Sequence, residues 1–303
     1  MTLVARLTGI GTFLAYDFDE TTVTKFRVGS DGTAYSNEFD ENTATTLSGS
    51  KRMSATSTGG LIVYDSINEI DPIDVIPTSG LQLYLDSGNA SSYSGSGTTW
   101  TDLSGNGRTG TLTNGPTYSA SSGGILNFDG NNDYVVISGY KGITGTGART
   151  SIIRFKSNLT NDFTRIFGWG GITAAGNKWV LNSDNVNYRL SLGTAGSAFV
   201  TGNTSTPNIV DGKWHTVAAT VGASQTVNDV KLYVDGNLLT DVTYGLGSTA
   251  INTLSSADVS IAASLADTTP ENLNGSVSQV LIYNRQLSDL EIKIVHRSIL
   301  NRY

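Results

Sequence analysis

Two short segments carry oxygen donors at spacings that suit a calcium ion. Asp102, Ser104 and Asn106 place oxygens at alternate positions in one loop, and Asn131 and Asp133 supply oxygens in another. Calcium prefers such hard ligands, but the twelfth position of the first loop holds a threonine, which excludes a helix–loop–helix calcium site. The same residue types also form ordinary turns by accepting backbone hydrogen bonds. The sequence therefore leaves two interpretations open, a Ca²⁺ site and plain turns.

Tryptophans offer a second kind of chemistry, because a flat aromatic ring can stack on a sugar ring. Trp169 and Trp179 flank a glycine-rich segment, and we interpret this pair as a carbohydrate platform. The alternative is that they fill a core, as most aromatic side chains do. Trp214 stands within an apolar, strand-like run and is expected in the core.

Catalytic groups are sparse in residues 81–303. Glu271 and Glu291 are the two glutamates there, and His215 and His296 are the two histidines of the chain, which has no cysteine. Glycoside hydrolysis needs a pair of carboxylates across the sugar, and nucleophilic catalysis needs an activated Ser, Cys or Thr beside a base. Neither arrangement is indicated, so we expect a protein that is not an enzyme.

Short alternating apolar segments supply the framework that must position these side chains. The 35 glycines favour turns and strands, and the Asp235-Gly236 pair predicts a tight hairpin. One helix is expected near the end, where Ser288 and Glu291 have capping-box spacing and an apolar stripe includes Leu290. The fold class is thus all-β with one short C-terminal helix, and the predicted strands of residues 81–303 are 81–85, 125–128, 134–137, 151–155, 165–169, 188–192, 216–221, 230–234, 259–263 and 277–283.

The first part of the chain reads as a separate, smaller β unit. Residues 14–18 and 24–28 alternate in polarity, as strands do, within a predicted unit of residues 1–64. Residues 65–80 become acidic and contain prolines, which predicts a linker. The β-sandwich then occupies residues 81–303.

Charge excludes several classes of partner. Residues 1–80 hold eleven acids and five bases, while residues 81–303 hold fifteen acids and fourteen bases, for a net charge of −7. Nucleic-acid binding needs clustered Lys and Arg, which the chain lacks. No apolar run is long enough to span a membrane, and Met1–Leu7 lacks the apolar core of a signal peptide. We therefore expect no nucleic-acid partner, no membrane insertion and no export signal.

Five motifs in order resemble those of laminin-G-like, concanavalin A-like domains. They cover nearly all of residues 81–303, and the motifs are 81–86, 100–107, 126–135, 211–218 with 231–236, and 282–292. This resemblance implies a two-sheet jelly-roll sandwich of the lectin type. The version with Gly97-Thr98-Thr99-Trp100 before the Asp-Leu-Ser-Gly-Asn-Gly turn is similar to domains on structural proteins of tailed bacteriophages.

The resemblance implies a non-enzymatic virion protein, such as a capsid decoration, head fibre or tail fibre. Its β-sandwich would face outward for adhesion to host-surface glycans or for particle stabilisation. Residues 1–64 would bind other virion proteins and form a homo-oligomer, for which a trimer is one possibility. A virion location would explain an external binding fold without a signal peptide. The alternative is a secreted or cell-surface carbohydrate-binding module that depends on calcium.

Overall fold

A computed structural model describes residues 76–157, 164–184, 189–267 and 272–300 in full, and the backbone of six strands before residue 76. The chain divides into two compact units, Met1–Val75 and Ile76–Tyr303. Of the predicted linker, residues 66–75 lie outside the described residues.

The first unit contains a four-stranded antiparallel sheet and a two-stranded antiparallel hairpin. The two segments that alternate in the sequence coincide with β2 and β3, which are adjacent in the sheet. The sheet has the order β1 (Arg6–Thr8), β2 (Thr12–Phe18), β3 (Val23–Val28), β4 (Ala34–Glu38), and the hairpin joins β5 (Lys51–Ala55) to β6 (Leu61–Asp65).

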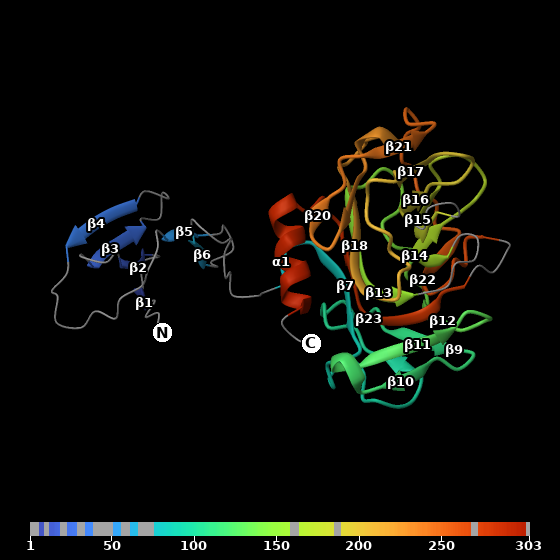
Figure 1. Cartoon of the computed structure of the whole chain (residues 1–303), viewed down its shortest axis with the longest axis horizontal. Coiled ribbons are helices and arrows are strands. Elements are labelled where there is room, and N and C mark those ends of the chain that lie inside the picture. The colour runs from blue at the N-terminus through green and yellow to red at the C-terminus, as the bar shows by residue number, and fades with distance from the viewer. Residues whose placement is uncertain are drawn as a thin grey trace. The chain divides into compact units, whose positions relative to one another are not determined.

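The second unit is a sandwich of two antiparallel sheets (Figure 1). The eight-stranded sheet has the order β10 (Thr117–Ser119), β11 (Ile125–Asp129), β23 (Asn274–Tyr283), β13 (Arg149–Ser157), β18 (Trp214–Val221), β19 (Lys231–Val234), β20 (Asn237–Leu238), and β7 (Leu81–Asp86) also pairs with β23. The nine-stranded sheet has the order β21 (Val242–Gly245), β17 (Phe199–Gly202), β16 (Leu190–Gly193), β15 (Lys178–Ser183), β14 (Arg165–Gly170), β22 (Ala257–Ile261), β12 (Tyr134–Ile137), β9 (Gly110–Thr113), β8 (Thr99–Trp100).

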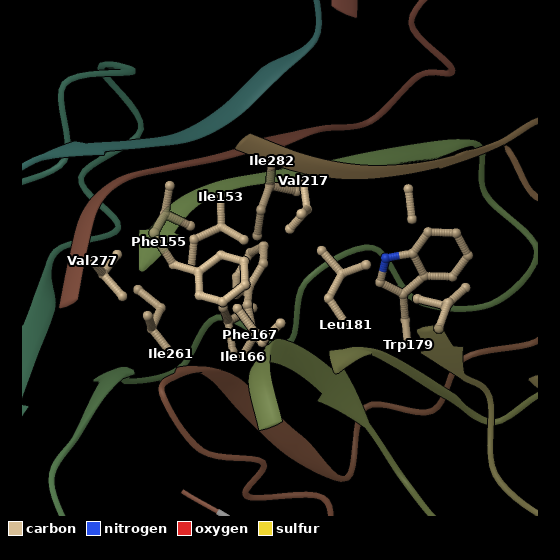
Figure 2. Packing of buried hydrophobic residues seen from close by; sticks show 14 of the residues in the cluster. Ile153, Phe155, Ile166, Phe167, Trp179, Leu181, Val217, Ile261, Val277 and Ile282 are labelled. Carbon is tan, nitrogen blue, oxygen red and sulfur yellow. The ribbon is translucent and has the colours of Figure 1, made fainter. Parts of the chain in front are cut away.

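The core lies between the two sheets, and Figure 2 shows part of it. Ile153 and Phe155 of β13 point into it, two residues apart, because successive side chains of a strand face opposite sides. They meet side chains such as Phe167 and Ile261 from the opposite sheet. Each fully buried side chain of this kind stabilises the fold by about 1.5–3 kcal/mol.

The helix α1 (Asp289–Leu300) covers the other face of the eight-stranded sheet. Val295 and Ile299 of α1 join Leu281 and Tyr283 of β23 in a second buried cluster, and Figure 1 shows α1 beside β7 and β20. The second half of strand β23 is therefore buried on both faces, which explains its apolar run from Val280 to Tyr283. The predicted stripe was wrong at one position, because Leu290 is only half-buried while Ile292 packs into the cluster.

Local sequence signals account for the start of α1 and for the hairpin between β19 and β20. Ser288 Oγ accepts the Glu291 N–H, and Glu291 Oε2 accepts the Ser288 N–H at 2.9 Å, which is the predicted capping box. Asp235 and Gly236 have φ angles of 51° and 76°, as a type I′ hairpin requires, between β19 and β20. The predicted fold class, an all-β sandwich with a C-terminal helix, is confirmed. Among the described residues, no helix has the length and apolar character needed to cross a membrane.

Candidate functional site

Asp102 has its carboxylate fully engaged by the chain. Oδ1 accepts the N–H groups of Tyr84 and Ser104, both at 2.9 Å, and Oδ2 accepts the Ser104 hydroxyl at 2.7 Å and the Arg108 N–H at 3.0 Å. Asn106 uses its amide nitrogen on backbone oxygens, including that of Leu81 at 3.1 Å. These contacts are those of a turn that anchors the loop to β7, and they leave Asp102 without a lone pair directed at a cation.

The second predicted calcium segment is also held by internal hydrogen bonds. Asp129 accepts the Asn131 N–H at 2.8 Å and its side-chain amide at 3.1 Å, and Asp133 Oδ2 accepts the Asp129 N–H at 3.2 Å. Burial and the charge of Asp129 raise the pKa of Asp133. Within the described residues, no three His, Asp or Glu side chains gather as a metal site.

The two tryptophans of the predicted platform lie in the core instead. Trp169 and Trp179 are 1% and 0% exposed, and Figure 2 shows Trp179 near Leu181 among the buried side chains. Their indole N–H groups donate to Ile143 O at 3.0 Å and Ser151 Oγ at 2.9 Å, which satisfies both rings inside the protein. Trp214, expected in the core, is half-buried with the Arg154 guanidinium 5.2 Å above its ring.

The candidate acid and base groups have structural partners. Glu291 forms a bidentate ion pair with Arg285, at 2.7 Å and 3.0 Å, in addition to its capping role. His215 lies between two aspartates, with Nδ1 2.8 Å from Asp235 and Nε2 3.1 Å from Asp211. Glu271 lies outside the described residues.

A groove of about 460 Å³ opens on the nine-stranded sheet. Its lining side chains alternate along the strands with core residues, as Asn182 does with Leu181, so they project from the face of the sheet that looks away from the core. Strand pairing aligns one polar residue from each of five neighbouring strands into a single row. In the order of the strands, this row is Arg165, Asn182, Ser191, Thr201 and Thr243.

Phe199 supplies an apolar surface beside this row. Its ring is half-buried and lines the groove. In the strand pairing, Phe199 lies opposite Gly193 on one side and opposite Gly245 on the other. A Cβ at Gly245 would collide with the Phe199 ring, so glycine allows the ring to lie over β21. The groove therefore combines one aromatic face with a line of hydroxyl and amide groups.

One buried acceptor in the groove has no partner. Asn182 is 2% exposed; its Nδ2 donates to Ser183 O at 3.1 Å, but its Oδ1 accepts no hydrogen bond from the described part of the chain. A buried unpaired polar atom costs about 1–3 kcal/mol. Oδ1 lies 3.5 Å from the point where a Cβ of Gly193 would stand, and Lys178 Cε lies 3.8 Å from the same point. The absence of a side chain at Gly193 thus leaves space between these two groups.

Sequence reasoning missed this groove. Ser and Thr at alternate strand positions are equally typical of a solvated sheet face, and only the register joins Asn182 to Ser191 and Thr201. The one available signal was Phe199, an aromatic residue on the same face of its strand as Thr201.

Comparison with known families agrees with this architecture. The Laminin_G_3 family, described as the concanavalin A-like lectin/glucanases superfamily, matches residues 129–293. The chain belongs to this superfamily. The match includes β12 to β23 and the start of α1, so every strand that lines the groove falls within the superfamily domain. The predicted laminin-G-like, concanavalin A-like domain is confirmed. No curated protein sequence matches the chain.

Solved structures with the superfamily fold include sugar-bound proteins. Domain 4 of AbnA, a GH43 extracellular arabinanase from Geobacillus stearothermophilus solved with arabinotriose, has a TM-score of 0.51 and 16% identity, over 72% of this chain and 98% of that one. The Trypanosoma rangeli sialidase in complex with sialic acid has a TM-score of 0.50 and 14% identity, over 97% of this chain and 52% of that one. The binding domain of Paraclostridial Mosquitocidal Protein 1 has a TM-score of 0.50 and 13% identity, over 73% of this chain and 53% of that one. The chain thus spans about half the length of the last two, and these likenesses show the fold alone.

Proposed function

We propose that the sandwich is a non-catalytic carbohydrate-binding module and that the groove on the nine-stranded sheet is its binding site. The observation that carries the proposal is the unpaired Oδ1 of Asn182, buried in a groove that also presents the Phe199 ring. A sugar has hydroxyl groups along its edge and C–H groups on its face. It therefore fits a site with an aromatic surface beside a row of hydrogen-bonding side chains.

The groove hydroxyls keep the capacity to bind such a ligand. Ser191 donates to Val200 O at 3.2 Å, and Thr243 donates to Asn203 Oδ1 at 2.8 Å. Each hydroxyl that donates once still has lone pairs that accept. Sugar hydroxyls could donate to these oxygens and to Asn182 Oδ1 together.

The ion-paired carboxylate of Asp267, beside the groove, does not favour hydrolysis. Burial alone would raise the pKa of Asp267, but the hydrogen bond from Lys178 and the charge of Arg165 hold that pKa below its ordinary value. An ion-paired carboxylate of this kind cannot serve as a general acid at neutral pH. We therefore propose binding without cleavage. Prolonged incubation with a bound oligosaccharide should release no shorter product, and product formation would contradict this part of the proposal.

Glycan binding by the full chain tests the proposal directly. We expect the protein to bind a subset of oligosaccharides on a glycan array and in titration calorimetry, with and without EDTA; arabinotriose belongs in the panel because a structure of the same fold was solved with it. The variant Asn182→Ala should lose the interaction while it remains folded. Silence of the wild-type protein across neutral and acidic glycans would reject the proposal.

The resemblance to phage structural proteins supports a biological setting for this module. In that setting the protein sits on the virion surface, the first unit binds other virion proteins and forms a homo-oligomer, and the sandwich contacts host-surface glycans. The motif Gly97-Thr98-Thr99-Trp100 before the turn that begins at Asp102 supports this placement. Immunogold electron microscopy of purified particles, with light scattering of the full chain, tests it. A monomeric chain that is absent from particles would contradict it.

A further inference from the structure

The groove is deep at one end and shallow at the other. Within the row of polar residues, Asn182 of β15 is 2% exposed and Ser191 of β16 is 4% exposed. Thr201 of β17 is partly exposed, and Thr243 of β21 is exposed. Strand β21 is the last strand on this side of the sheet. The row thus becomes more accessible from β15 outward, and the groove opens toward the edge at β21.

A loop folds over the sheet at the deep end. It follows β22, where Ser260 faces away from the core because its neighbours Val259 and Ile261 both lie in it. Ser260 Oγ donates to Ala263 O at 3.0 Å and accepts the Leu265 N–H at 3.2 Å. These two hydrogen bonds hold the loop against the outer face of β22.

The same loop is fastened across the end of the row. Asp267 forms ion pairs with Arg165 of β14, at 3.2 Å from Nε to Oδ2, and with Lys178 of β15, at 2.7 Å from Nζ to Oδ1. Val180, between two core residues of β15, faces away from the core and is nevertheless 0% exposed. The outer face of the sheet is therefore covered here, and the row reaches the loop at Arg165.

The two ends of the groove admit different parts of a ligand. The unpaired Asn182 Oδ1 lies at the deep end, where a ligand that continued along the row would meet the loop. Only a group that projects from the tip of a ligand fits there, and Gly193, which has no side chain, leaves room for it. At the other end, a ligand can pass over the exposed Thr243 and leave the sheet at its edge.

We propose that the groove recognises the end of a glycan chain. A hydroxyl group of the terminal sugar donates to Asn182 Oδ1, and the following sugars extend across β16 and β17 to β21. This inference rests on the proposed carbohydrate-binding function and specifies which part of the glycan is bound. Adjacent strands lie about 4.8 Å apart, so the path from Asn182 to Thr243 is roughly 14 Å long, enough for a short oligosaccharide.

Oligosaccharides that are blocked at one end test this inference. The probes are linear arabino-, gluco- and galacto-oligosaccharides and any further linear glycan that the full chain binds on the array. Titration calorimetry compares each free chain with one methylated on its non-reducing terminal sugar and one coupled through its reducing end to a bulky carrier. One modification should weaken binding by at least about tenfold, because the buried Asn182 Oδ1 loses its donor, and the other should leave the affinity unchanged.

The outcomes separate this inference from the proposed function. Equal affinity for all three forms would show that the groove binds internal stretches of a glycan, and it would overturn the inference while the carbohydrate-binding function stands. Binding to no glycan at all would reject both.

Two hydroxyl deletions distinguish the ends of the groove. Ser191→Ala, near the deep end, should weaken the binding of every oligosaccharide severalfold, whatever its length. Thr243→Ala, at the edge, should weaken only chains long enough to reach β21. Thr111→Ala is the matched control, because Thr111 is an exposed threonine of β9 in the same sheet that does not line the groove. If Thr243→Ala weakened the shortest chains as much as the longest, the terminal sugar would not lie at Asn182 and the inference would be wrong.

Discussion

His215 Nδ1 lies 2.8 Å from Asp235 Oδ2, so the start of β18 is tied to the hairpin between β19 and β20. Asp211 Oδ1 approaches the other ring nitrogen at 3.1 Å. Burial by itself lowers the pKa of His215, but the hydrogen bonds and charges of Asp235 and Asp211 outweigh burial and raise that pKa above its ordinary value. Protonation of the imidazole between these two carboxylates therefore stabilises the fold.

This bridge predicts a pH-dependent stability difference between the wild-type protein and His215→Gln. A pKa raised in the folded state gives stabilisation that is complete below the unfolded pKa, about 6.5, and is lost as pH rises through the folded pKa. We expect the wild type to exceed the variant by about 1–2 kcal/mol in free energy of unfolding under mildly acidic conditions, and by less at alkaline pH.

Urea denaturation of both proteins across this range measures the difference. Burial lowers the pKa of His296, so its titration works in the opposite direction in both proteins, and Asp235 links it to His215. A pH-independent difference would show that the two carboxylates do not hold a proton on His215.

Phe199→Ala should weaken glycan binding strongly with little change in fold. Loss of an aromatic face against a ligand costs roughly 0.5–1.5 kcal/mol beyond the loss of buried apolar area, so affinity should fall about tenfold. Tyr244→Ala is the matched control, because Tyr244 is an exposed aromatic residue of β21 that does not line the groove. Calorimetric titration with the best ligand of the wild type compares the three proteins, and equal losses in both variants would argue against the Phe199 surface.

Gly193→Ala tests the gap between Asn182 and Lys178. A Cβ there would meet Asn182 Oδ1 at 3.5 Å and Lys178 Cε at 3.8 Å, which are ordinary contacts, so the empty protein should tolerate the methyl group. A ligand in the gap would collide with it. We expect an unchanged melting temperature and a large loss of glycan affinity. Full affinity in this variant would place the ligand elsewhere.

Asp102→Ala should destabilise the fold without any change in metal dependence. The substitution leaves the N–H groups of Tyr84, Ser104 and Arg108 without their acceptor, which costs about 2–4 kcal/mol. EDTA should not shift the thermal unfolding of the wild-type protein. Differential scanning calorimetry with EDTA and with added Ca²⁺ checks both, and stabilisation by Ca²⁺ that Asp102→Ala removes would support the calcium interpretation over the turn.

Signals that act over a few residues were readable from the sequence. The Asp235-Gly236 hairpin and the Ser288–Glu291 cap depend on neighbours within three residues, and both formed as predicted. Every predicted strand of residues 81–303 overlaps an observed one. Short strands such as β8, β10, β20 and β21 were missed because two to four residues carry too little alternation to identify.

Burial and register could not be read in the same way. Trp169 and Trp179 stand beside glycines that suggested a loop, yet the glycines let β14 and β15 approach closely with both indoles inside. The polar row that contains Asn182 depends on the pairing of five strands. Residues far apart along the chain, such as Arg165 and Thr243, come into the same row only through this pairing. A single sequence contains no direct record of that pairing.

The alternation along β15 to β17 also separates two kinds of evolutionary constraint. Along these strands a core residue, such as Leu181 or Val200, is followed by a residue that faces outward, such as Asn182 or Thr201. A substitution at an outward position would change what the proposed binding face recognises without altering the volume of the interior behind it. Such a surface can drift from one ligand to another by single replacements, while the scaffold beneath it keeps the same thermodynamic stability.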